Sequence, residues 1–313
     1  MAQRILYIDC FSGASGDMLL GALIDAGLAL DDLKADLGHL ALSDYELAVE
    51  RRVSHGISAT HFTVLDHAQS HPARNLGAVR ELVEASGLDA EVIDQSLRVF
   101  RRLAEAEARI HGTTIDEVHF HEIGAVDSLI DIVGFCAGLR RLGVEAVYAS
   151  PLPLGSGTIR TQHGLLPVPV PATLALLAEV GAPTIPSEAQ GELVTPTGAA
   201  LLTTLATFGR PAMRVHAVGY GLGTKTFPWA NIVRAWLGEA IEAQVGRGPI
   251  QPHDHAHDRG HSHDHEPHGH DHDHGHGHDH EHGHEHEHDA GHEHAAHGSA
   301  SADVHDTASH GVT

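Results

Sequence analysis

The sequence predicts a mixed α/β or α+β body over residues 1–248, followed by a disordered, histidine-rich tail over 249–313. In the body, apolar runs of strand length alternate with segments whose apolar residues recur at helical spacing. In the tail, 22 of the 32 histidines follow Pro252, Arg259 is the only basic residue, and aromatic residues are absent. Such a segment has too little apolar surface to offset the entropy lost on folding. The pattern predicts the elements and leaves the strand order open.

The body begins with a strand, a tight loop and a helix. RILYIDC (4–10) is an apolar run of strand length, FSGASGD is a Gly/Ser loop, and MLLGALIDAGL (18–28) has helical spacing. Residues 45–67 then alternate apolar and polar side chains around His55-Gly56, which predicts a hairpin.

The middle of the body predicts two amphipathic helices, the first ending at Gly87 and the second at Gly112. VEAVYASPLPLGSG then reads as a strand that runs into a Pro/Gly loop. PVPVPATLALLAEVG begins with prolines, which exclude a central strand, and ends as a short helix. TPTGAALLTTLATFG predicts a helix with Thr195 as N-cap and Pro196 at its first position. Residues 220–240 predict a glycine-rich turn followed by a strand or a helix.

The segment VHFHEIGAVDSLIDIVG gathers candidate metal ligands. On a strand, His119 and His121 point to one face, with Glu122 at the strand end. On a helix, Asp127 and Asp131 share a face because they are four residues apart. Imidazoles with carboxylates suit a divalent transition metal. The alternative makes Asp127 a helix cap or first-turn acid and the histidines surface strand residues.

The loop in DCFSGASGDM joins a strand to a helix, where free backbone N–H groups favour an anion such as phosphate. Asp9 and Asp17 bracket the loop and suit a metal-bridged phosphate, and Cys10 could be a thiolate ligand. The loop lacks the spacing of a P-loop or a dinucleotide fingerprint, and the alternative is an ordinary turn. The candidate ligand-binding residues of this loop are Ser12, Gly13, Ser15 and Gly16.

Two further segments resemble phosphate-binding loops. GYGLGTK supplies Gly221, Gly223 and Lys225, and GELVTPTGAALL supplies the hydroxyls of Thr195 and Thr197 at a helix N-terminus. Each signal is weak alone, and several in one body favour a nucleotide-like ligand.

The tail alternates histidine with Asp, Glu and Gly, which predicts metal binding. Neutral imidazole suits nickel, copper and zinc. A flexible tail selects little by geometry, so it indicates storage or delivery of the ion, and the alternative is a solvated spacer or a tag. The candidate ligands are His270, His272, His274, His276, His278, His280, His282, His284, His286 and His288.

Charge and composition exclude several classes of partner. The net charge is −23, of which the tail supplies −13, so the acidic body predicts neither nucleic-acid nor membrane-surface binding. Two cysteines are too few for a disulfide framework. The N-terminus does not resemble a signal peptide, and no apolar run is long enough to span a membrane, so a cytoplasmic location is expected.

Six ordered motifs resemble the LarC family of nickel insertion proteins, over about residues 4–240. They are ILYIDCFSGASGDMLLGALIDAG, VHFHEIGAVDSLIDIVG, YASPLPLGSG, HGLLPVPVPAT, GELVTPTGAALL and GYGLGTK. The resemblance implies CTP-dependent insertion of Ni²⁺ into pyridinium-3,5-bisthiocarboxylic acid mononucleotide, which forms one carbon–nickel and two sulfur–nickel bonds. The product is the nickel-pincer cofactor of lactate racemase, and the enzyme class is a lyase. Carbon metallation releases a ring proton, for which His121, Glu122 or Asp127 could be the base.

The resemblance covers only the first part of the family's chain. It implies that CTP, with Mg²⁺ or Mn²⁺, binds a C-terminal domain, and that the lactate racemase apoprotein is the downstream acceptor. The chain is expected to be either a subunit that pairs with a separate C-terminal subunit or a shortened form. A homo-oligomer is compatible with the sequence. The alternative functions are a non-catalytic nickel storage or delivery protein, and a phosphate-binding hydrolase unrelated to nickel.

Overall fold

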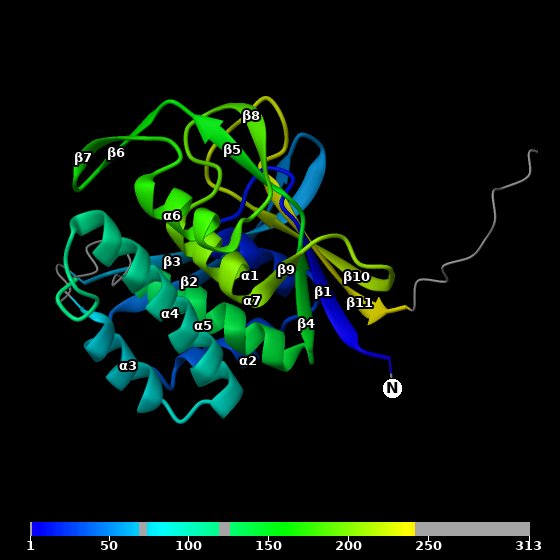
Figure 1. Cartoon of the computed structure of the whole chain (residues 1–313). Coiled ribbons are helices and arrows are strands. Elements are labelled where there is room, and N and C mark those ends of the chain that lie inside the picture. The colour runs from blue at the N-terminus through cyan, green and yellow to red at the C-terminus, as the bar shows by residue number, and fades with distance from the viewer. Residues whose placement is uncertain (1, 69–73, 119–125, 242–313) are drawn as a thin grey trace, which may run out of the picture. The chain divides into compact units, whose positions relative to one another are not determined.

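The computed structural model describes residues 2–68, 74–118 and 126–241, and confirms an α/β body (Figure 1). Its main sheet has seven strands in the order β2-β3-β10-β11-β1-β4-β9. The strands are β1 (Arg4–Asp9), β2 (Tyr45–Ser54), β3 (Ile57–Asp66), β4 (Ala146–Ala149), β9 (Ala206–Phe208), β10 (Met213–Leu222) and β11 (Ile232–Ala240).

The sheet is mixed in direction. β1 lies inside it, parallel to β4 and antiparallel to β11, and four of its six residues are buried. β2 and β3 form the predicted antiparallel hairpin, and β3 is parallel to β10, with Thr60 opposite Gly221. Two small pairs stand apart from this sheet: β5 (Leu152–Ser156) with β8 (Thr184–Gln190), and β6 (Thr158–Thr161) with β7 (Gly164–Pro167).

Helix α1 lies against strands β3 and β10, and α5 packs on α1. Helix α4 then contacts α5, α6 and α7, and α3 packs on α4 (Figure 1). The helices are α1 (Gly16–Asp25), α2 (Leu30–Leu37), α3 (Leu76–Glu84), α4 (Ala90–His111), α5 (Val126–Arg141), α6 (Pro171–Val180) and α7 (Pro196–Leu205).

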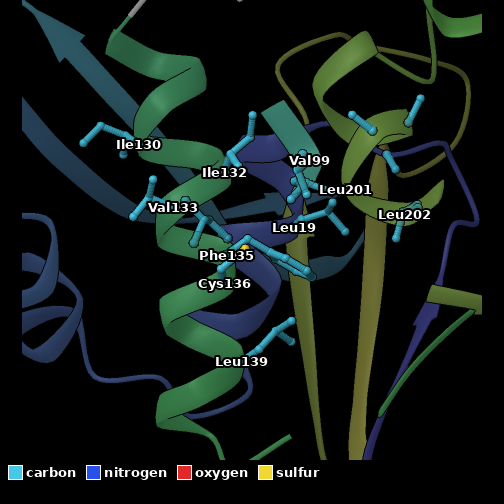
Figure 2. Packing of buried hydrophobic residues seen from close by; sticks show 14 of the residues in the cluster. Leu19, Val99, Ile130, Ile132, Val133, Phe135, Cys136, Leu139, Leu201 and Leu202 are labelled. Carbon is cyan, nitrogen blue, oxygen red and sulfur yellow. The ribbon is translucent and has the colours of Figure 1, made fainter. Parts of the chain in front are cut away.

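Helix α5 is the centre of the hydrophobic core. From Val126 to Leu139, every residue except Asp127 and Asp131 is buried, as expected for a helix covered on all sides. The two carboxylates are therefore exceptions in an otherwise buried stretch of the helix. Figure 2 shows α5 side chains packed with residues of α1, α4 and α7, among them Leu19, Val99, Ile132, Phe135, Leu201 and Leu202.

Most of the predicted elements are confirmed. Both amphipathic helices form, and Gly112 ends α4 in the left-handed conformation. The prolines do exclude a central strand, because β7 pairs only with β6 and α6 begins at Pro171. Thr195 caps α7, with its Oγ1 accepting from the Gly198 N–H at 3.2 Å.

The turn predicted at the start of 220–240 begins later than expected, because Tyr220–Leu222 belongs to strand β10; a loop from Gly223 then leads into strand β11. Strand β10 has glycine at positions 219 and 221 because α1 crosses the strand there and leaves no room for a side chain. A Cβ on Gly221 would overlap the Met18 carbonyl oxygen, and one on Gly219 would overlap that of Ala22. Close approach of a helix, which sequence spacing does not reveal, explains these two glycines.

The described elements belong to one unit, Met1–Pro249, and the second unit, Ile250–Thr313, lies outside the described residues. The predicted disorder of the tail and the domain boundary therefore stay predictions. No described helix is long and apolar enough to cross a bilayer.

Candidate functional site

A cavity of about 370 Å³ opens where the N-termini of α1 and α7 meet the first turns of α5. Strand β3 forms another wall with Phe62, Thr63 and Val64. Its polar lining consists of Ser15, Asp17, Thr63, Glu107, Asp127, Ser128, Asp131, Glu192, Thr195, Thr197 and Thr224.

Backbone hydrogen bonds join the two loops that lead into α1 and α7. Ala14 donates to the Leu193 carbonyl at 3.0 Å, and Thr195 donates to the Ala14 carbonyl at 3.1 Å. Gly198 allows this approach, because a Cβ there would overlap the Ala14 carbonyl group. Two helix N-termini, with their partial positive charge and N–H groups, therefore open on the same cavity.

Three aspartates come together in this cavity. Asp17 lies in the first turn of α1, and Asp127 and Asp131 lie one turn apart on α5. The Asp131 carboxyl group packs so closely on the start of α1 that a Cβ on Gly16 would overlap it. Like charges held this close favour a cation or a proton among them.

The electrostatics reflect this crowding. Burial raises the pKa of Asp131 well above its ordinary value, and the charges of Asp17 and Asp127 raise it further. Burial of its carboxyl group also raises the pKa of Asp127, against a hydrogen bond from the Ser128 N–H at 2.7 Å. Asp127 still keeps an exposed surface, so it borders the cavity mouth, whereas Asp131 lies deeper.

A second cavity of about 160 Å³ adjoins the first and shares Ser15, Asp17, Glu192, Thr195 and Thr224 with it. It adds Gly223, Lys225, Phe227 and Asn231. Among the described residues that line the two cavities, Lys225 is the only Lys or Arg. Its ammonium group donates to the Glu192 carbonyl at 2.8 Å, which holds it beside the loop that leads into α7.

The structure brings together nine of the predicted site residues. Ser15, Gly16, Asp17, Asp127, Asp131, Thr195 and Thr197 line the larger cavity, and Gly223 and Lys225 line the smaller one. The Ser15 hydroxyl donates to the Asp17 carboxylate, which ties the loop to the acidic group.

Five other predicted residues line neither cavity: Asp9, Cys10, Ser12, Gly13 and Gly221. Asp9 forms an ion pair with Arg234. Ser12 is buried and accepts from the Trp229 indole N–H at 3.0 Å. Gly13, at φ 103°, packs on the Leu193 backbone.

Cys10 lies in the core beneath the loop. Burial raises the pKa of its thiol to about 12. The group is therefore a neutral thiol in this structure, whereas metal ligation needs a thiolate.

The remaining predicted residues, His119, His121, Glu122 and His270–His288, lie outside the described residues. Within the part of the chain that is described, no group of three or more His, Cys, Asp or Glu side chains is arranged to hold a metal ion. The three aspartates thus form an acidic cavity wall and not a finished metal cage.

In the polar lining of the larger cavity, the prediction from sequence missed Thr63, Glu107, Ser128, Glu192 and Thr224. Ser128, Glu192 and Thr224 lie within the motifs VHFHEIGAVDSLIDIVG, GELVTPTGAALL and GYGLGTK, so the predicted residues beside them are a usable signal. Thr63 and Glu107 carry no such signal in the sequence, because a threonine in a strand and an acid on an amphipathic helix are common.

The fold and the cavity define a class of protein: an α/β protein that presents carboxylates, hydroxyls and helix N-termini to a small anionic or metal-bearing ligand. A family model described as nickel insertion protein matches residues 6–269. The chain belongs to the nickel insertion protein family, as its motifs predicted.

Relatives agree with this assignment. The chain is 52% identical over 241 residues to the "Putative nickel insertion protein" of Roseiflexus castenholzii, covering 77% of this chain and 61% of the relative. It is 46% identical over 252 residues to the pyridinium-3,5-bisthiocarboxylic acid mononucleotide nickel insertion protein of Desulfitobacterium hafniense, covering 80% and 62%. The matched part thus spans about three fifths of each relative's length. No solved structure matches the chain.

Proposed function

We propose that this chain is the nickel- and substrate-binding body of a CTP-dependent nickel insertase that acts on pyridinium-3,5-bisthiocarboxylic acid mononucleotide. The observation that carries the proposal is the cavity in which Asp17, Asp127 and Asp131 lie beside the N-termini of α1 and α7. The carboxylates suit a divalent cation, and the helix N–H groups suit an anionic group of the substrate.

The substrate phosphate binds where α1 and α7 begin. Ser15 N-caps α1 without a side-chain hydrogen bond to its first turn, so those N–H groups are not capped by that hydroxyl. The hydroxyls of Thr195 and Thr197 and the ammonium group of Lys225 lie around the same loops. Hydrogen bonds from N–H groups, together with one cation, are the chemistry that phosphate prefers.

The aspartates bind Ni²⁺, and a base near the substrate accepts the ring proton that is lost when nickel bonds to the ring carbon. Burial, together with the charges of Asp17 and Asp127, raises the pKa of Asp131, and a divalent cation beside the group stabilises the carboxylate, so Asp131 releases its proton to solvent when the ion arrives. Nickel then bonds to two sulfurs and one ring carbon, and the ring proton passes to a base. Asp127 borders the cavity and is the described candidate, with His121 and Glu122 as the other two.

CTP, with Mg²⁺ or Mn²⁺, acts through a separate C-terminal subunit or domain in this proposal. Support comes from the share of the relatives that the match leaves uncovered. The reaction belongs to the lyase class, takes place in the cytoplasm and delivers the nickel-pincer cofactor to lactate racemase. A homo-oligomer is compatible with this role.

The tail supplies nickel to the cavity. Its histidines, interleaved with acids, are the observation that favours the second candidate function, a non-catalytic nickel store or delivery protein.

Deletion of residues 253–313 separates the two functions. We expect nickel insertion, measured with the C-terminal partner, CTP and excess Ni²⁺ by mass spectrometry of the product, to persist without the tail. Loss of insertion in the deletion variant at saturating nickel would contradict the proposed role of the cavity.

Substitution of the aspartates locates the reaction. Asp127→Asn and Asp131→Asn should each reduce insertion at saturating nickel, whereas Asp31→Asn, an exposed carboxylate on α2 outside both cavities, should not. A double His119→Ala/His121→Ala variant tests the ligands outside the described residues. Unchanged insertion in that variant would remove them from the site.

A further inference from the structure

Two histidines that the proposed function does not use meet where helix α4 ends. His111 ends helix α4, and His163 lies in the turn between β6 and β7. Their ring centroids are 4.9 Å apart with the planes tilted by 47°. In Figure 1 the hairpin lies beside the C-terminal end of α4.

The histidine pair is connected to the cavity through Glu107. The His111 Nε2 lies 3.3 Å from the Glu107 Oε2, one helical turn earlier on α4. Glu107 itself lines the cavity that contains Asp127 and Asp131. His111 is therefore one side chain away from the cavity.

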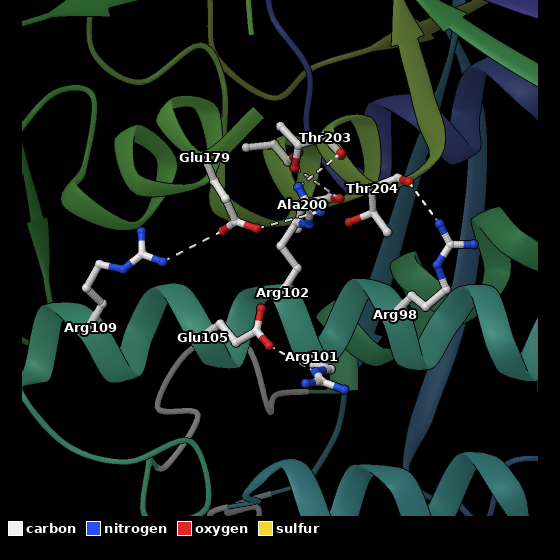
Figure 3. A network of polar contacts seen from close by, with 10 residues as sticks. Arg98, Arg101, Arg102, Glu105, Arg109, Glu179, Ala200, Thr203 and Thr204 are labelled. Atoms are coloured by element: carbon white, nitrogen blue, oxygen red, sulfur yellow. Dashed lines mark hydrogen bonds and ion pairs between the residues drawn. The ribbon is translucent and has the colours of Figure 1, made fainter. Parts of the chain in front are cut away.

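Helix α4 is held firmly enough to fix this position. Arg102 and Arg109 both pair with Glu179 of α6, at 3.7 Å and 3.9 Å (Figure 3). Arg102 also donates to the Thr203 carbonyl at the end of α7 at 3.2 Å (Figure 3). These contacts tie the last three turns of α4 to its neighbours, so His111 and Glu107 have a defined place.

The spacing of the rings suits a shared metal ion. With a metal–nitrogen bond of about 2.1 Å, each ring centroid lies roughly 3.2 Å from the ion, so two adjacent ligands have centroids roughly 4.5–5 Å apart. A carboxylate that accepts from one ring nitrogen orients the other toward the ion, which is the usual arrangement around metal-bound histidine. The Glu107 carboxylate lies 3.3 Å from the His111 Nε2, close enough to take that role.

We infer that His111 and His163 form an entry site for a divalent transition-metal ion, oriented by Glu107, from which the ion passes to the cavity aspartates. Two protein ligands bind less firmly than a closed cage, and water completes the coordination. That weakness fits an ion in transit. The destination of the ion rests on the proposed function, but its binding to the two imidazoles does not.

The test is a footprint on the full chain, without substrate or CTP. Diethylpyrocarbonate modifies accessible imidazoles, and mass spectrometry reads each histidine separately, so the tail histidines do not obscure the result. With Ni²⁺ in excess over all histidines, we expect modification of both His111 and His163 to be lost. His216 is the matched control because, like His111, it lies beside a carboxylate: its Nε2 is 3.9 Å from the Glu239 carboxylate.

The His163→Ala variant shows whether the two imidazoles share one ion. In that variant we expect nickel no longer to protect His111 from modification by diethylpyrocarbonate. A melting temperature equal to that of the wild type shows that the variant is folded. Protection of His111 that persists in His163→Ala, or equal protection of His216, would overturn the inference. If the footprint holds but nickel insertion is absent, the proposed function fails and the entry site stands.

Discussion

Asp131→Asn should stabilise the folded body while it reduces nickel insertion. Burial raises the pKa of the wild-type carboxyl group in the folded state, and the charges of Asp17 and Asp127 raise it further. Asparagine keeps the shape of the side chain but cannot ionise, so the variant avoids the cost of a buried, crowded charge.

The magnitude follows from proton linkage. Because the folded-state pKa lies above the unfolded value of about 3.9, the folded chain holds a proton that the unfolded chain releases, and stability falls as pH rises between the two pKa values. Each pKa unit by which the folded-state value exceeds the unfolded value lowers the free energy of unfolding by about 1.4 kcal/mol, or the melting temperature by roughly 3–6 °C for a body of this size. The full cost applies above the folded pKa, so the variant gains most there.

Thermal unfolding from pH 4.5 to pH 8, in wild type and variant, measures this effect. The difference in melting temperature should grow with pH and then level off, whereas Asp31→Asn should lower the melting temperature slightly because it removes a first-turn acid from α2. A gain that is independent of pH, or no gain at all, would refute the argument that the carboxylate is crowded. A variant that is more stable and less active is the expected signature of a functional carboxylate.

Three further results are expected. Gly198→Ala should destabilise the chain by about 1–3 kcal/mol in chemical denaturation, because its Cβ overlaps the Ala14 carbonyl. The control Gly77→Ala, at an exposed position in α3, should stabilise the chain by up to about 1 kcal/mol. Equal changes in stability for the two variants would contradict the close packing of Gly198 on the Ala14 backbone. Thr195→Ala should cost about 1 kcal/mol through the lost cap and Thr195→Ser much less, and a serine as costly as alanine would argue against capping. Cys10 and Cys136, whose pKa values burial raises to about 12, should react with iodoacetamide at pH 8 only after unfolding; rapid labelling of native Cys10 would show a reactive thiolate.

Local sequence signals were sufficient where neighbouring residues decide the structure. The strand–loop–helix of residues 4–28 and the hairpin at His55-Gly56 follow from apolar spacing and turn chemistry, and both are observed. The shared face of Asp127 and Asp131 also follows from a four-residue spacing on a helix.

Local signals failed where a distant segment decides the structure. Gly221 resembles a turn residue in the sequence, but α1 packs on it within a strand. The partner of Asp9 is equally out of reach of local signals, because Arg234, which pairs with it, lies 225 residues later.

The sequence alone therefore determined the family, a mixed α/β or α+β body and most of the residues that carry the proposed chemistry, because ordered motifs and short-range spacing are written along the chain. Only the tertiary structure decided which of these residues share a cavity. It also placed Glu107 beside that cavity and His111 against His163. These contacts depend on packing between helices and strands that are far apart in the chain, and no local pattern encodes such packing.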